Sequence, residues 1–226
     1  MRKLLYIPII HAQSDLGSLG PAIEGVSASL VGASRWARHK TAVAGFWKAI
    51  EDYLTSVDAK GLKIYQDGLA AEGELGRKVV AEAARRGSKN HQIVLALMDR
   101  GAEIRKTEDV SLLLEEGRRL LEAVQERPPG PKTSDRSARE RDLTGERDRF
   151  AAARINETLK EGETGVLFMG AYHDILSHLS KDILVTPVKD RDKILAYFQG
   201  LLAGDDDKSL EQLAGYIASP VKYQDP

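Results

Sequence analysis

GVLFMGAYHDI, residues 165–175, is an apolar run that ends at a glycine and is followed at once by a histidine and an aspartate. LLYIPIIHAQSD, residues 4–15, likewise ends its apolar stretch in a histidine, His11. Strands that are buried on both faces lose the alternation of apolar and polar residues. Both runs therefore predict inner strands of a sheet that is covered on both faces, and they place His11 and His173 at the ends of these strands.

The rest of the chain alternates short strand-like runs with longer helical patterns. Further strands are predicted at 62–68, 102–109 and 182–188, and the intervening segments carry apolar residues at three- and four-residue spacing, as in 35–56. This alternation is typical of an α/β protein with a mostly parallel central sheet flanked by helices on both faces. We expect one domain over residues 1–226. Proline, glycine and dense charge predict a mobile loop or insertion at 127–146.

The composition limits the classes of function. The 33 basic and 34 acidic residues give a formal net charge of −1, which does not favour a general nucleic-acid-binding protein. The absence of cysteine excludes disulfides, thiolate metal ligands and thiol nucleophiles. No run approaches the roughly 18 apolar residues of a membrane span, and the N-terminal apolar run is short and holds a proline. We therefore expect a cytoplasmic protein without a membrane segment.

Polar residues follow four of the predicted strands. His11, Asp67, Glu108 and His173 each come at or just after a strand end. Parallel α/β sheets bind their ligands beyond the carboxyl ends of the strands. Imidazole nitrogens together with carboxylate oxygens suit zinc, manganese or iron(II), which lower the pKa of a bound water. The same groups also serve without a metal, because a histidine held by a carboxylate is a general base. The ordinary explanations are helix caps and, for Asp67 before glycine, turn formation.

Several common motifs are missing. The chain has no phosphate-binding loop with its lysine and no GxGxxG element. It also has no GxSxG element, so the catalytic triad of an α/β-hydrolase is not expected.

Residues 146–175, ERDRFAAARINETLKEGETGVLFMGAYHDI, resemble the C-terminal half of the superfamily that includes erythromycin esterase, the ChaN haem-binding lipoproteins, the TraB proteins and the Tiki metalloproteases. Its members carry an Arg-Asp or Arg-Asn pair that opens a helix, here Arg147-Asp148, and a strand ending in Gly-x-x-His, here 170–173. PIIHAQSD is similar to the superfamily's N-terminal element, although Ile9-Ile10 replace its Gly-Glu. The chain as a whole also resembles a group of bacterial and archaeal proteins that begin MRKLLYxPIIH, a likeness that implies no activity.

The leading hypothesis is a hydrolase, with or without a metal, acting on a small molecule or a peptide. His173 would be a metal ligand or the general base, and His11 a second ligand or an orienting group. Asp67 and Glu108 would complete the metal site. Arg147 would neutralise an anionic intermediate or pair with a site carboxylate, because arginine stays charged and offers a forked set of donors.

Two other hypotheses remain open. The same pocket could bind haem, through Tyr172 and His173, or a small anion without catalysis. Alternatively, the loop 127–146 could bind a partner protein. The last two predicted helices either pack on the sheet or form the contact of a homodimer.

Overall fold

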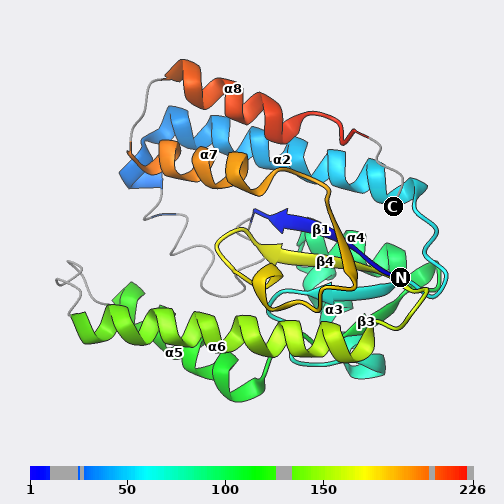
Figure 1. The fold of residues 1–226 in the computed structure, drawn as a ribbon. Helices are drawn as coiled ribbons and strands as arrows, with labels where there is room; N and C mark the ends of the chain where they lie inside the picture. The colour runs from blue at the N-terminus through cyan, green and yellow to red at the C-terminus, as the bar shows by residue number, and fades with distance from the viewer. Residues whose placement is uncertain (11–24, 26–27, 126–133, 204–206, 223–226) are drawn as a thin grey trace.

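A computed structural model of the chain describes residues 1–10, 25, 28–125, 134–203 and 207–222. Its sheet has the strand order β3-β2-β4-β1-β5, and every strand pair is parallel (Figure 1). The strands are β1 (Arg2–Ile9), β2 (Lys63–Gln66), β3 (Glu103–Arg105), β4 (Thr164–Gly170) and β5 (Ile183–Pro187). The predicted α/β class is therefore confirmed.

Helices connect the strands and cover the sheet (Figure 1). They are α2 (Ala33–Ser56), α3 (Gly73–Arg85), α4 (Lys89–Asp99), α5 (Val110–Gln125), α6 (Ser134–Thr158), α7 (Arg191–Ala203) and α8 (Asp207–Ala218), with the short 3-10 helix η2 (Leu176–His178) after β4. None of the helices in the described part of the chain is both long and apolar enough to cross a membrane.

The central strands are buried on both faces, as their apolar sequences predicted. In β1, Leu5 and Ile7 pack into the larger core, which contains apolar residues of α2, α4, α7 and α8. Leu4 and Tyr6 of the same strand pack into a second core on the other face, against α6. Because both faces of β1 contact apolar side chains, the strand shows no alternation of polar and apolar residues.

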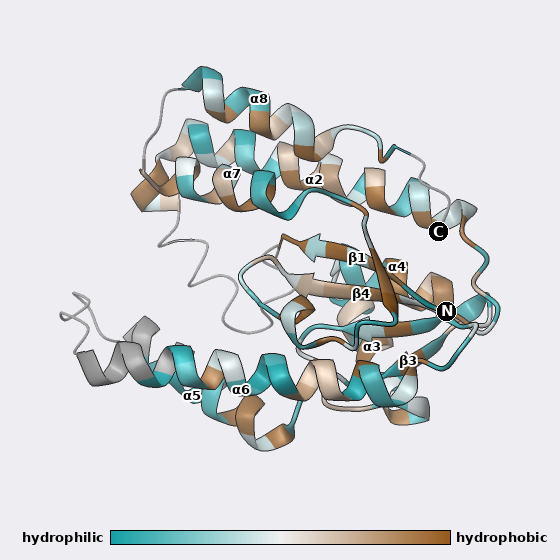
Figure 2. Cartoon of the chain, viewed as in Figure 1, coloured by the Kyte–Doolittle hydropathy of each residue, from teal (hydrophilic) through white to brown (hydrophobic). Residues whose placement is uncertain are grey.

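The segment 127–146 is the part of the prediction that the structure corrects. Helix α6 begins at Ser134, so 134–146 is helical rather than a loop, and 127–133 lie outside the described residues. The prolines that suggested a loop, together with Gly130, lie between 128 and 131, whereas Gly145 lies within α6. In the charged part that follows, Arg139 pairs with Glu146 along α6 at 3.0 Å and with Glu115 of α5 at 2.9 Å. Figure 2 shows many hydrophilic residues along α6. The charged residues here thus lie in a helix and form ion pairs within it and with α5.

Candidate functional site

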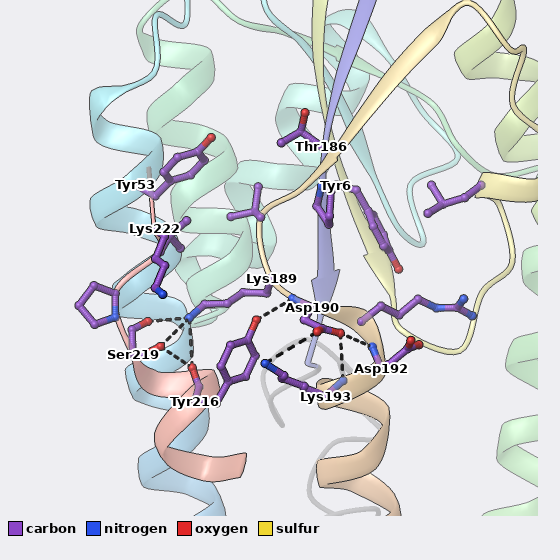
Figure 3. A pocket seen from close by; sticks show the side chains of 16 residues that line it. Tyr6, Tyr53, Thr186, Lys189, Asp190, Asp192, Lys193, Tyr216, Ser219 and Lys222 are labelled. Atoms are coloured by element: carbon purple, nitrogen blue, oxygen red, sulfur yellow. Dashed lines mark hydrogen bonds and ion pairs between the residues drawn. The ribbon is translucent and has the colours of Figure 1, made fainter. Parts of the chain in front are cut away.

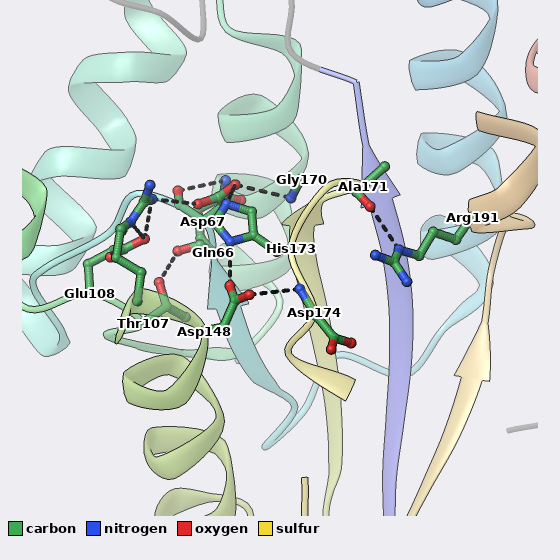
Figure 4. Close-up of polar contacts among 11 residues, drawn as sticks. Gln66, Asp67, Thr107, Glu108, Asp148, Gly170, Ala171, His173, Asp174 and Arg191 are labelled. Atoms are coloured by element: carbon green, nitrogen blue, oxygen red, sulfur yellow. Dashed lines mark hydrogen bonds and ion pairs between the residues drawn. The ribbon is translucent and has the colours of Figure 1, made fainter. Parts of the chain in front are cut away.

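Four of the residues singled out in the sequence lie together at the carboxyl edge of the sheet (Figure 4). Asp67 follows β2, Glu108 follows β3 and His173 follows β4, and these three strands are neighbours. Arg147 reaches the same place from α6. His11 lies outside the described residues.

Asp67 is fixed by the end of β4. Its backbone N–H donates to Phe168 O at 2.8 Å, and its Oδ2 accepts the Gly170 N–H at 3.0 Å. The next residue, Gly68, has φ 74°, a left-handed conformation that glycine adopts without steric cost. The turn expected from the Asp-Gly pair is therefore present, and it also directs the carboxylate into the site.

Arg147 and Glu108 form a buried ion pair. The Arg147 Nη2 donates to Glu108 Oε1 at 2.6 Å, and Nε lies 3.2 and 3.1 Å from the two carboxylate oxygens. The same Nη2 lies 3.5 Å from Asp67 Oδ1. Burial is the main cause that raises the pKa of Glu108 above its ordinary value, although Arg147 opposes the shift. Burial alone would lower the pKa of Arg147, but the hydrogen bonds that it donates to Glu108, together with the charges of Glu108 and Asp67, outweigh burial, so the pKa is raised. Arg147 therefore remains charged while it bridges two carboxylates.

Asp148 holds His173 in place. Its Oδ1 lies 2.5 Å from His173 Nδ1, and its Oδ2 accepts the Asp174 N–H at 2.8 Å. With both oxygens bonded, the carboxylate orients the imidazole, so that Nδ1 carries a proton and Nε2 faces Asp67 Oδ2 at 3.9 Å. Burial would lower the pKa of His173, but the hydrogen bond to Asp148 and the charges of Asp67 and Asp148 outweigh it, so the pKa is raised above its ordinary value.

The site is a row of alternating charges that runs from Glu108 through Arg147, Asp67 and His173 to Asp148. Three carboxylates face one arginine and one histidine, so the row stays net negative even when His173 is protonated. This charge balance favours proton uptake at Nε2. It raises the pKa of His173, so the imidazole stays protonated to a higher pH than a histidine in solvent does.

The predicted metal set fits this geometry only in part. Asp67 Oδ2 and His173 Nε2 face each other and could provide two ligands. Both oxygens of Glu108, however, lie within hydrogen-bonding distance of Arg147, so this carboxylate is not free to bind a cation. Within the described residues, no group of three or more histidine, aspartate and glutamate side chains could hold a metal ion. The metal site, with His11 as a further ligand, stays a prediction.

Tyr172 does not join the group. It is 62% exposed, and its ring lies 6.5 Å from that of Phe198 in α7, centroid to centroid. His173 has its Nδ1 bonded to Asp148, which leaves Nε2 as its free ring nitrogen for a ligand. Haem binding through Tyr172 and His173 also stays a prediction.

Asp148 is the residue of the site that we did not predict. The Arg147-Asp148 pair carried the family resemblance, but only Arg147 was given a role. The pair was expected to open a helix, whereas it lies near the middle of α6. Successive helical residues point about 100° apart, which follows from 3.6 residues per turn. Arg147 can therefore contact Glu108 while its neighbour Asp148 contacts His173.

Comparisons of the chain with protein-family models, with curated proteins and with solved structures found no match. The resemblance to the erythromycin esterase superfamily therefore stays a prediction.

Proposed function

We propose that the chain is a hydrolase in which His173, oriented by Asp148, moves protons between a water molecule and the leaving group. The observation that carries this proposal is the imidazole held at Nδ1 by Asp148, with Nε2 facing Asp67 across 3.9 Å. This gap is longer than a direct hydrogen bond, and a water molecule that bridges the two groups would be positioned by both.

The chemistry requires His173 to act first as a base. Neutral Nε2 takes a proton from the water as the water oxygen attacks the carbonyl carbon of an ester or amide. The imidazolium that forms lies between the carboxylates of Asp148 and Asp67, which stabilise its charge. Nε2 then donates the proton to the leaving group as the tetrahedral intermediate collapses. The raised pKa of His173 makes the neutral imidazole a stronger base for the first step.

Arg147 is suited to stabilise the anionic intermediate. Its Nε and Nη2 are engaged by Glu108 and Asp67, whereas Nη1 has no hydrogen bond to a described residue. The side chain is 11% exposed, so a charge that develops beside it would be poorly screened by solvent. Glu108 would then act as a positioning residue for the arginine.

The experiment is a hydrolysis screen with p-nitrophenyl esters and p-nitroanilide peptides. We expect the wild-type chain to cleave at least one class, and His173→Ala to lose about 100-fold or more of kcat, the range of a lost general base. His178→Ala is the matched control, because His178 is exposed in η2 a few residues later. Equal rates in the two variants would refute the role of His173. Dialysis against EDTA separates the two forms of the proposal, since only a metal-assisted hydrolase would lose activity and regain it with zinc or manganese.

A further inference from the structure

A cavity lies at the carboxyl end of β5 (Figure 3). Its volume is about 620 Å³, within the range of small-molecule sites. The residues that matter for its chemistry are Tyr6, Leu176, Lys189, Arg191, Lys193 and Tyr216. None of them belongs to the row of charges described above.

The cavity wall is net positive. Lys189, Arg191, Lys193 and Lys222 line it, against only two acidic residues, at positions 190 and 192. The Oδ1 of Asp190 accepts the backbone N–H groups of Asp192 and Lys193 at 2.9 and 3.3 Å, so this carboxylate caps the first turn of α7. Its Oδ2 lies 3.9 Å from Lys193 Nζ, too far for a direct hydrogen bond.

Arg191 offers the donors that an anion needs. Its Nε donates to Ala171 O at 2.8 Å, which fixes the guanidinium (Figure 4). The two terminal nitrogens make no hydrogen bond to a described residue, and none of the described carboxylates forms an ion pair with this arginine. A planar guanidinium with two free N–H groups matches the two oxygens of a carboxylate or a phosphate.

Tyr216 and the lysines complete the wall. The Tyr216 hydroxyl accepts the Asp190 N–H at 2.8 Å, so its own proton is available to another acceptor. Lys193 Nζ lies 4.4 Å from the centroid of the Tyr216 ring. Lys189 is 3% exposed, and its Nζ donates to Ser219 O at 2.6 Å and to Tyr216 O at 3.3 Å, which fixes the end of α8.

The cavity adjoins the proposed hydrolytic site. Arg191 is bonded to Ala171, two residues before His173, and Leu176 in the cavity wall follows His173 by three residues. Tyr6 also lines the cavity, and the charges of Arg191, Asp67 and Asp148 all affect the pKa of its phenol. The cavity wall and His173 are therefore held by the same loop after β4.

We propose that this cavity binds the anionic group, a carboxylate or a phosphate, of a small-molecule substrate, and that Arg191 is its principal binding residue. The anion binding stands on the cavity alone. That the anion is part of the substrate rests on the proposed hydrolase function.

The test is calorimetric titration of the full chain at low ionic strength with two probes, inorganic phosphate and succinate. We expect binding of at least one probe, weakened about tenfold or more in Arg191→Gln and severalfold in Lys193→Gln. Arg85→Gln, which removes the same charge from the exposed end of α3, should bind as the wild type does. The preferred probe identifies the ligand class.

Three outcomes would overturn the proposal: the wild type binds neither probe, Arg191→Gln binds as tightly as Arg85→Gln, or Lys193→Gln is unaffected. If Arg191→Gln proves unfolded in a thermal scan, the binding measured for Lys193→Gln decides the test. Lys193 is 51% exposed, so its replacement leaves no buried gap. His173→Ala should retain anion binding. Retained binding in a protein that hydrolyses nothing would thus reject the hydrolase and keep the anion site.

Discussion

The carboxylate of Asp148 orients the imidazole of His173, and the carboxylates of Asp148 and Asp67 together raise its pKa. Asp148 bonds to Nδ1 directly, whereas Asp67 acts on Nε2 across 3.9 Å. Since its folded-state pKa is raised, His173 stabilises the fold most fully below its ordinary pKa. That contribution is lost as the pH rises through the folded-state value.

We expect Asp148→Asn to lower the pKa of His173. Asparagine can still accept the Nδ1 hydrogen bond through its amide oxygen, but it no longer supplies the negative charge that favours the imidazolium. NMR titration of the His173 Cε1–H resonance measures this shift without a substrate.

Asp174→Asn is the control for that titration, because the Asp174 carboxylate accepts from Ser177 Oγ at 2.9 Å rather than from His173. An equal pKa shift of His173 in both variants would mean that the charge of Asp148 affects the imidazole no more than the charge of Asp174 does.

The neighbourhood of Asp67, Glu108 and His173 could be predicted from the sequence, because parallel strands end at one edge of a sheet. The contribution of Asp148 could not. It depends on how α6 lies across the strands, which is a matter of tertiary packing that no local spacing encodes. The position of His11 relative to His173 stays untested, since His11 lies outside the described residues.

At the scale of elements, the contact between α2 and α8 depends on a residue without a side chain. A Cβ placed on Gly45 would lie 2.6 Å from the Cβ of Ala218. Non-bonded carbon atoms do not approach so closely, so the two helices can pack at this distance only because position 45 is glycine.

We expect Gly45→Ala to lower the free energy of unfolding by about 1–3 kcal/mol, because α8 must move away from α2. Gly215→Ala in α8 should instead raise the free energy of unfolding by up to about 1 kcal/mol, because nothing lies within 4 Å of its added methyl group and alanine favours the helix. Urea denaturation with an unchanged m-value measures both. A Gly45→Ala chain as stable as wild type would contradict this contact.

Local patterns were enough to identify the elements but not their arrangement. The helix at 35–56 could be predicted because burial on one face imposes a period on its sequence, and β4 because burial on both faces gives a continuous apolar run. The start of α6 was missed because the preceding prolines suggested a loop, while the ion pairs of Arg139 join residues that are not adjacent in the chain. The strand order is set by contacts between distant segments, so the sequence did not predict it.

At the scale of the whole molecule, a histidine with no place in the proposed chemistry influences how stability depends on pH. His39 of α2 is 6% exposed, and its Nδ1 lies 3.0 Å from the Tyr197 hydroxyl of α7. Burial lowers the pKa of His39 to about 4. The folded chain therefore holds this ring neutral at pH values where the unfolded chain protonates it.

The unfolded state takes up a proton at His39 as the pH falls below about 6.5, and the folded state does so only near pH 4. Over this interval the wild type should lose on the order of 3 kcal/mol of stability through this group. We expect His39→Gln, which does not titrate, to lose correspondingly less when unfolding is measured at a series of pH values. Parallel pH curves for the two proteins would contradict this assignment, and His178→Gln serves as an exposed control.

The position of β1 between β4 and β5 has a consequence for biosynthesis. Lys3 pairs with Thr164 in β4, and Arg2 pairs with Ile183 in β5, so β1 is made long before either partner. During synthesis, the backbone N–H and C=O groups along both edges of this apolar strand have no strand partner until most of the polypeptide has emerged from the ribosome. Folding that depends on such distant strand pairings is slow and leaves apolar surface exposed to solvent. We therefore expect the nascent chain to depend on chaperones.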